Sequence, residues 1–211
     1  MLRFGSTRKL PQEIYLDSSV IIDVFYSFHL PNKPREYLPR LNETHRFIER
    51  LERQGSRLYV SLLTIEESLH GTRTMARDNW LKENIVRLPT ELKTTVERAK
   101  EEGTNRLRIS DRDVRKHPSI WDQILVYARA QVRFVQKKIT GSSVELLSPE
   151  ENETTAIVGD TIKLHDAYDL DVADCFHIAT GKALGILHYA SNDMGWKQLD
   201  GVDGITVYSA C

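Results

Sequence analysis

The chain has 211 residues and a formal net charge of −1, from 29 Lys and Arg against 30 Asp and Glu. Hydrophobic residues make up 40% of it, enough to bury a substantial core, and no apolar stretch approaches the roughly 20 residues that span a bilayer. The balanced charge does not by itself indicate a nucleic-acid binder, which usually carries a basic domain or patch.

The first residues lack the apolar run and the small-residue cleavage site of a secretory signal, so we expect a cytoplasmic protein. The two cysteines are Cys175, inside an apolar helical pattern, and Cys211, the last residue. A buried helical residue and a chain end are poor disulfide partners, which agrees with a reducing compartment.

The N-terminal part predicts a short buried strand at 14–16 that ends at Asp17, followed by a helix over 20–28. Three prolines, at 31, 34 and 39, indicate a loop, because the residue before a proline disfavours helix. Asn42 is then the expected N-cap of a helix that ends near Gln54.

The remaining chain alternates short apolar runs with helical patterns. The strands are expected at 57–60, 186–190 and 205–208. The segment 73–148 is mostly helical and highly charged, and the other helices are expected at 61–71, 119–139, from 148 toward 165, and 172–184. Such alternation predicts an α/β fold with a parallel sheet covered on both sides.

Four carboxylates fall where such a sheet binds ligands, outside the carboxyl ends of its strands. Asp17 and Asp193 follow strands, while Glu67 and Asp174 lie in the first turns of helices. Gathered acids repel one another and raise each other's pKa unless a cation joins them. Mg²⁺ and Mn²⁺ prefer such oxygen ligands and support phosphodiester chemistry, so the sequence predicts a metal site formed by these four residues.

The same segments resemble a known family. Residues 16–23 read LDSSVIID, residues 60–71 read VSLLTIEESLHG, residues 172–179 read VADCFHIA, and residues 189–193 read YASND. In this order they resemble the four motifs of PIN domains, and more specifically of VapC-type toxins from toxin–antitoxin pairs. Ser19 and Ser191 stand where the family has Asn and Thr, and both keep a small hydrogen-bonding side chain.

The resemblance implies a three-layer α/β/α fold with four to five parallel strands, and a metal-dependent endoribonuclease with Mg²⁺ or Mn²⁺ at its catalytic carboxylates. It implies RNA as the substrate, and an antitoxin protein and a second copy of the chain are the protein partners to consider. We expect one PIN-like domain over 1–211, in which 73–148 is a helical insertion or elaboration that the family does not explain.

Several of these residues have a second interpretation. Asp17 and Asp174 also suit helix N-caps, with Asp171 as the competing cap of the second helix, and Asp193 suits a turn. Glu66 competes with Glu67 as the ligand, and because successive helical positions are about 100° apart, only one of them faces the site. Alignment on the motif favours Glu67.

Other residues receive supporting or structural assignments. Ser18, Ser19 and Ser191 are candidates to hold carboxylates or metal-bound water, or to cap turns. Asp23 can line the rim of the pocket, but a solvated or capping residue is the favoured interpretation. His177 shares a helix face with Asp174 and could bind a metal, but its apolar neighbours favour a hydrogen-bonded core histidine.

Two basic clusters could contact an RNA backbone, although charge runs of this kind are usually solvated faces, which we favour for each cluster. Trp80 and Trp121 could stack bases, but packing between helices is the favoured interpretation. The clusters are Arg106, Arg108, Arg112, Arg115 and Lys116, and Arg129, Arg133, Lys137 and Lys138.

Two other classes of function remain open at this point. A PIN-like fold can serve as a nucleic-acid- or protein-binding module without cleavage, although the presence of all four acids disfavours this. Another Mg²⁺-dependent phosphotransfer protein also places Asp after its first strand, but the local sequence Asp-Ser-Ser lacks the D-x-D of an aspartyl phosphatase.

Overall fold

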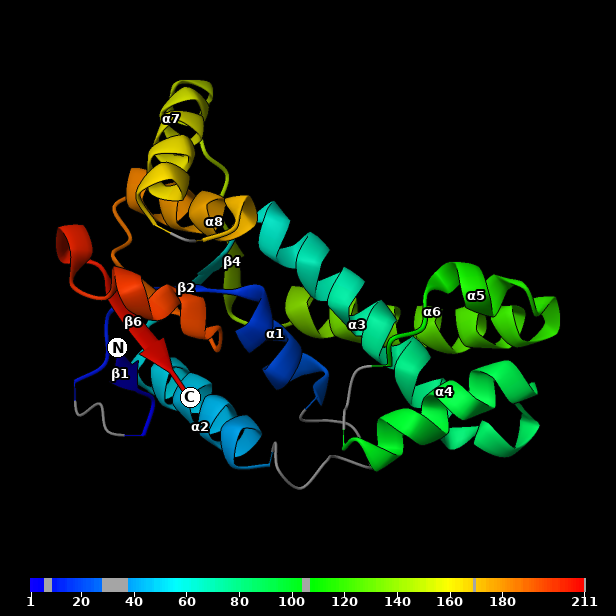
Figure 1. Cartoon of the computed structure of the whole chain (residues 1–211). Helices are drawn as coiled ribbons and strands as arrows, with labels where there is room; N and C mark the ends of the chain where they lie inside the picture. The colour runs from blue at the N-terminus through cyan, green and yellow to red at the C-terminus, as the bar shows by residue number, and fades with distance from the viewer. Residues whose placement is uncertain (6–8, 28–37, 104–106, 169, 211) are drawn as a thin grey trace. The chain divides into compact units, whose positions relative to one another are not determined.

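The computed structural model describes residues 1–5, 9–27, 38–103, 107–168 and 170–210 (Figure 1). Its internal contacts divide the chain into two compact units. Unit 1 comprises residues 1–68 and 139–211, and unit 2 comprises residues 69–138. The prolines at 31 and 34, Arg106 and Cys211 lie outside the described residues.

Unit 1 contains one parallel sheet, which in the described residues has six strands in the order β1-β6-β5-β2-β3-β4. The strands are β1 (Leu2–Arg3), β2 (Glu13–Leu16), β3 (Arg57–Val60), β4 (Val144–Leu146), β5 (His188–Ala190) and β6 (Thr206–Ser209). The predicted α/β class with an all-parallel sheet is confirmed. The inner strands β6, β5, β2 and β3 carry most of the buried positions, and Tyr15 pairs in register with both Tyr59 and Tyr189.

The expected number of four to five strands is too small. The two strands that the sequence did not reveal, β1 and β4, are the edges of the sheet. Both are short and mostly exposed, so they lack the apolar run by which a buried strand is recognised. Strand β4 also lies inside the segment 73–148 that was expected to be helical.

The helices of unit 1 stand close to their predicted positions. They are α1 (Ser18–Phe25), α2 (Leu38–Gln54), α7 (Glu151–Ala167) and α8 (Val172–Ala183), with short 3-10 helices η4 (Met194–Leu199) and η5 (Val202–Gly204). Helix α1 packs against α2, and α7 packs against α8 (Figure 1). The expected N-cap at Asn42 is wrong, because α2 begins at Leu38 and takes Pro39 into its first turn, where no intrahelical N–H bond is lost.

A core of aromatic and aliphatic side chains holds the elements of unit 1 together. Tyr15, Tyr189 and Trp196 are fully buried in it, and their rings lie in tilted contact. Gly181 in α8 lies so close to the Tyr189 ring that an added Cβ would meet the phenol oxygen at 2.6 Å. The close approach of α8 to β5 therefore depends on a glycine at this position.

Unit 2 consists, in its described residues, of helices and the loops that connect them. It contains most of α3 (Leu62–Glu83), then η3 (Ile85–Arg87), α4 (Thr90–Glu101), α5 (Asp111–Arg115) and most of α6 (Pro118–Thr140). The pattern at 61–71 is thus only the start of a longer helix that continues through Gly71. Its own apolar core includes Trp80 and Leu81, with Trp121 packed against its edge, so the packing assignment of both tryptophans is confirmed.

Within the described ranges, every helix is either too short or too polar to cross a lipid bilayer.

Candidate functional site

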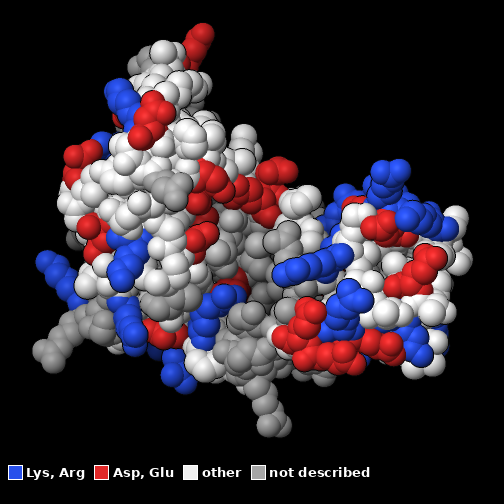
Figure 2. All heavy atoms as spheres, viewed as in Figure 1, with Lys and Arg blue, Asp and Glu red and all other residues white. Residues whose placement is uncertain are grey.

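The candidate site lies in unit 1, where strands β2, β3 and β5 end and helices α1, α3 and α8 begin. Asp17 directly follows β2, and residues 191–193 directly follow β5. The backbone N–H of Asp17 donates to the carbonyl of Ala190 at 3.0 Å, which ties the ends of these two strands together. Figure 2 shows a cluster of acidic side chains in this part of unit 1. In Figure 1, the same region contains the first turns of α8 and α3.

Asp17 is the best-anchored carboxylate of this edge and is only 4% exposed. The hydroxyls of Ser19 and Ser191 donate to its Oδ2 at 2.5 and 2.9 Å, and Ser18 donates to Oδ1 over a long 3.4 Å. Asp17 is also the N-cap of α1, so its two interpretations, cap and site residue, describe the same side chain. The three supporting serines all contact Asp17.

Glu67 turns toward Asp17, while Glu66 is exposed. Oxygen Oε2 of Glu67 lies 2.9 Å from Nε2 of His177, which is fully buried in α8. Burial raises the pKa of Glu67, but the hydrogen bond and the electrostatic interaction with His177 and a bond from Ser18 outweigh it and leave that pKa below its ordinary value. The geometry therefore selects Glu67 of the two adjacent glutamates.

His177 is held from its other side by a buried network of hydroxyl groups. Its Nδ1 lies 2.7 Å from the hydroxyl of Tyr15 and 3.4 Å from that of Thr64, and Ser61 accepts from Tyr15 at 2.8 Å. The expectation of a hydrogen-bonded core histidine is confirmed, although one of its partners is a site carboxylate. His177 was not among the site residues predicted from the sequence, where its position three residues after Asp174 was the available signal.

The described residues contain one group of side chains with the spacing of metal ligands: Asp17, Glu67 and His177. One ligand atom from each of them lies within 4.8 Å of the others. Two carboxylate oxygens and an imidazole nitrogen at this spacing can hold a divalent cation. Asp174 and Asp193 lie outside this group.

Asp174 borders the group and responds to its charge. Burial, together with the negative charges of Asp171, Asp17 and Asp193, raises the pKa of Asp174 to about 6, against the lowering effect of a bond from Trp196. Nε1 of Trp196 donates to Oδ1 of Asp174 at 2.9 Å. The N-cap of α8 is Asp171, which accepts from the Asp174 N–H, so the structure selects Asp171 of the two candidate caps.

Asp193 is exposed at the end of the β5 segment. Its Oδ1 accepts from the N–H of Gly195 at 2.8 Å, which makes it the N-cap of η4. Its charge reaches Asp174, and the preceding Ser191 donates to Asp17 while accepting from the Asp193 N–H. The short segment 191–193 therefore connects the predicted fourth carboxylate to the anchored first one.

A second buried carboxylate near this edge was misinterpreted from the sequence. Asp23 is neither solvated nor a cap: it is 3% exposed, forms an ion pair with Arg40 at 2.9 Å and accepts from Asn192 at 2.8 Å. Burial raises the pKa of Asp23 despite both partners. Because Asn192 lies between Ser191 and Asp193, this network fixes the backbone that carries two of the site residues.

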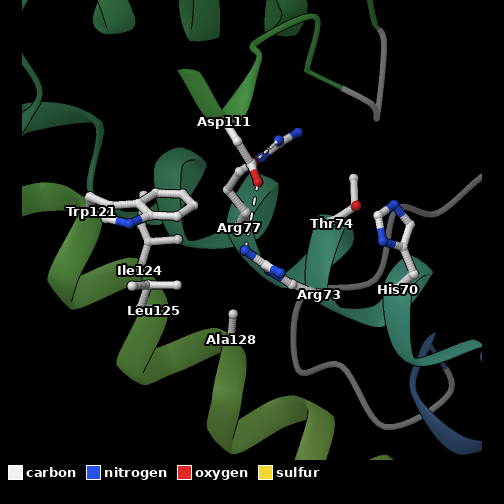
Figure 3. Close-up of a pocket in the computed structure, with 9 residues that line it drawn as sticks. All are labelled: His70, Arg73, Thr74, Arg77, Asp111, Trp121, Ile124, Leu125 and Ala128. Carbon is white, nitrogen blue, oxygen red and sulfur yellow. Dashed lines mark hydrogen bonds and ion pairs between the residues drawn. The ribbon is translucent and has the colours of Figure 1, made fainter. Parts of the chain in front are cut away.

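Unit 2 contains a small pocket of its own (Figure 3). Arg77 reaches toward Asp111 and forms ion pairs with Asp78 and Asp111 at 2.8 and 2.6 Å, and Arg73 lies 3.7 Å from Asp111. Asp78 in turn accepts from the N–H of Leu107 at 2.9 Å. This ionic network joins α3 to α5 and to the residues before it.

No protein-family model and no curated protein matches this sequence. Among solved structures, the chain is similar to VapBC2 from Rickettsia felis bound to a DNA fragment from their promoter, with a TM-score of 0.44, 8% identity, and coverage of 93% of this chain and 98% of that chain. It is also similar to FitAcB from Neisseria gonorrhoeae, with a TM-score of 0.37, 13% identity, and coverage of 93% and 97%. Both scores are too low to establish a common fold, and both identities are too low to carry residues or functions across.

Proposed function

We propose that this chain is a metal-dependent endoribonuclease that hydrolyses phosphodiester bonds of RNA, with Asp17, Glu67, Asp174 and Asp193 as its catalytic carboxylates. The observation that carries the proposal is that ligand atoms of Asp17, Glu67 and His177 lie within 4.8 Å of one another, at the carboxyl ends of the central strands. Four ordered sequence motifs lead independently to the same edge.

The residues at this edge fit a divalent cation. Asp17 and Glu67 offer carboxylate oxygens at ligand spacing. Burial and, after it, the neighbouring negative charges raise the pKa of Asp174, and a cation would favour the charged form of this carboxyl. When bound, Mg²⁺ or Mn²⁺ supplies polarisation of a phosphoryl oxygen and a water of lowered pKa.

The protein's own contribution is to hold these groups in place before substrate arrives. Ser19 and Ser191 fix one oxygen of Asp17, His177 fixes one oxygen of Glu67, and Trp196 fixes one oxygen of Asp174. Each of these partners comes from an element different from that of its carboxylate, except Ser19. The sheet edge and the helix starts must therefore be correctly packed for the site to exist.

RNA as the substrate, the PIN-like three-layer arrangement and the role of a cytoplasmic toxin rest on the motif resemblance. We propose on the same basis an antitoxin protein as the partner that would restrain the nuclease, and a homodimer as its assembly. None of these follows from the carboxylates alone, which indicate a metal and a phosphodiester.

The decisive experiment compares the chain with its Asp17→Asn variant on structured RNAs in the presence of Mn²⁺. We expect cleavage by the natural chain only, and its loss when EDTA replaces the metal. Cleavage by both proteins, or by neither across a range of divalent metals, contradicts the proposal. RNA binding without cleavage would support the binding-module alternative.

A further inference from the structure

The near-neutral charge of the chain conceals a division between its two units. Unit 2 has 16 Lys and Arg against 9 Asp and Glu, a net charge of +7, while unit 1 has 13 against 21, a net charge of −8. A phosphodiester polymer is attracted by the positive charge of unit 2 and repelled by the negative charge of unit 1. The affinity for such a polymer should therefore reside in unit 2.

Within unit 2, helices α4 and α6 differ in how their charges are balanced, and α6 carries part of the excess positive charge. Helix α4 carries Lys93, Arg98 and Lys100, but Glu91, Glu97 and Glu101 balance them. Helix α6 carries four basic residues in its second half and no acid after Asp122. Helix α4 thus has the mixed charges of an ordinary solvated face, whereas α6 does not.

Three of the four basic side chains in the second half of α6 share one side of the helix. Arg129, Arg133 and Lys137 are spaced four residues apart and are exposed, which aligns them along about 12 Å of the helix axis. The opposite side is buried and includes Ile124, Ala128 and Val135. We call the three aligned residues the α6 basic face.

Apolar groups accompany this face. Val126 is 70% exposed and Phe134 is 38% exposed, and Nζ of Lys138 lies 5.5 Å from the centre of the Phe134 ring. Aromatic rings beside cations provide stacking surfaces for unpaired bases, as in proteins that bind single strands without sequence preference. By contrast, Arg77 in the pocket of unit 2 is already paired with two carboxylates, so that pocket does not supply a free anion site.

We propose that the α6 basic face binds the backbone of single-stranded RNA, and that unit 2 thereby supplies the substrate affinity that the acidic unit 1 lacks. The choice of RNA among polyanions rests on the proposed nuclease function. The binding itself rests on the charge and the exposure of α6.

The test is fluorescence anisotropy of a labelled single-stranded RNA, titrated with the full chain in EDTA at several salt concentrations. The variant combines Arg129→Gln, Arg133→Gln and Lys137→Gln. Loss of three phosphate contacts should lower the salt slope of binding by about 2 and weaken binding at least tenfold, since each contact to a single strand contributes roughly 0.7 to the slope. All three side chains are exposed, so the helix content measured by circular dichroism should not change.

A matched control removes the same charge from α4 through Lys93→Gln, Arg98→Gln and Lys100→Gln. We expect this control to keep the affinity and slope of the natural chain. If both variants bind RNA equally weakly, the α6 basic face is not the binding surface. The same conclusion follows if the α6 variant binds RNA with the affinity and salt slope of the natural chain. Binding of a polyglutamate peptide through the same three residues, with no binding of RNA, would also overturn it.

The Asp17→Asn variant separates this inference from the nuclease proposal. It should bind RNA as the natural chain does, because its substitution lies in unit 1. RNA binding that depends on α6, in a chain that cleaves no RNA, supports the inference and contradicts the nuclease. Cleavage that is indifferent to the three α6 substitutions, with unchanged binding, supports the nuclease and contradicts the inference.

Discussion

In unit 1 a parallel sheet brings side chains from distant parts of the sequence to one edge, while unit 2, in its described residues, is made of helices around a separate apolar core. Unit 1 carries a net charge of −8 and unit 2 a net charge of +7. In unit 1, Asp17 and Glu67 lie at ligand distance from each other, an arrangement that suits the cleavage of a single bond. An exposed helix spreads cations along a line, which suits a polymer backbone. Under the two proposals made above, catalysis belongs to unit 1 and substrate affinity to unit 2 of the same chain.

The largest effect is expected at the carboxylates of unit 1. Glu67→Gln should lower the rate of Mn²⁺-dependent RNA cleavage at least roughly a hundredfold, because loss of a second-shell partner alone costs about 10 to 100-fold. Glu66→Gln is the matched control and should cleave as the natural chain does, since Glu66 is exposed. Single-turnover cleavage assays measure both, and an equal loss in the two variants would contradict the geometry of α3.

The core of unit 2 provides the next largest effect. Leu81→Ala removes a fully buried side chain and should lower the free energy of unfolding by about 3 kcal/mol. Val86→Ala, at an 89% exposed position, should change it by less than about 0.5 kcal/mol.

Urea unfolding followed by circular dichroism measures both values. Hydrogen exchange on the Leu81→Ala variant then sharpens the comparison of the units: protection should fall more in residues 69–138 than in the strands of unit 1. An equal fall throughout would show that the two units open as one.

A smaller effect is expected on the free energy of unfolding, which the charged form of Asp174 lowers. Because burial and neighbouring charges raise the pKa of Asp174 from 3.8 to about 6, its protonated form is favoured in the folded chain. The stability gained from this proton is complete below about pH 4 and is lost as the pH rises through about 6. Asp174→Asn should therefore raise the free energy of unfolding by about 1 to 2 kcal/mol near pH 8 in EDTA, after solvent screening is allowed for.

The measurement is urea unfolding of both proteins at several pH values. The advantage of Asp174→Asn should vanish near pH 4, and the variant should cleave no RNA at any pH. A variant less stable than the natural chain near pH 8 would show that the bond from Trp196 outweighs the repulsion among the acids.

The smallest effects are expected at two helix caps. Asp171 accepts from the Asp174 N–H at the start of α8, and Ser110 accepts from the Asp113 N–H at the start of α5. Alanine at either position should cost about 1 kcal/mol of stability. Only Asp171→Ala should also slow cleavage, because α8 carries both Asp174 and His177; thermal unfolding and cleavage assays together distinguish the two caps.

The sequence predicted the central part of the fold well and its edges poorly. Strands β2 and β3 and helices α1 and α8 follow from apolar runs and caps, because their residues are buried and leave a clear pattern. Strands β1 and β4 escaped because exposed edge strands need few apolar residues. The start of α2 was missed because Pro39 was interpreted as a breaker, although proline fits the first turn of a helix.

The site shows the same division. Asp17, Glu67, Asp174 and Asp193 were named from motif and topology, and the structure gathers Asp17 and Glu67 while leaving Asp174 and Asp193 beside them. His177 was recognised as a core histidine but not as the partner of Glu67, since that contact joins residues 110 positions apart. The interpretation of Asp23 failed for a similar reason, because Arg40 and Asn192 approach it only in the folded chain.

By itself, the sequence determined which residues carry charge and which local patterns form strands and helices. Those properties belong to single side chains and their near neighbours, and they include the excess of cations in residues 69–138. Only the tertiary structure decided that Glu67 rather than Glu66 faces Asp17, that His177 joins them, and that burial raises the pKa of Asp174. Distances between segments far apart in the chain, and the desolvation that burial imposes, arise only when the strands align and the helices pack against them.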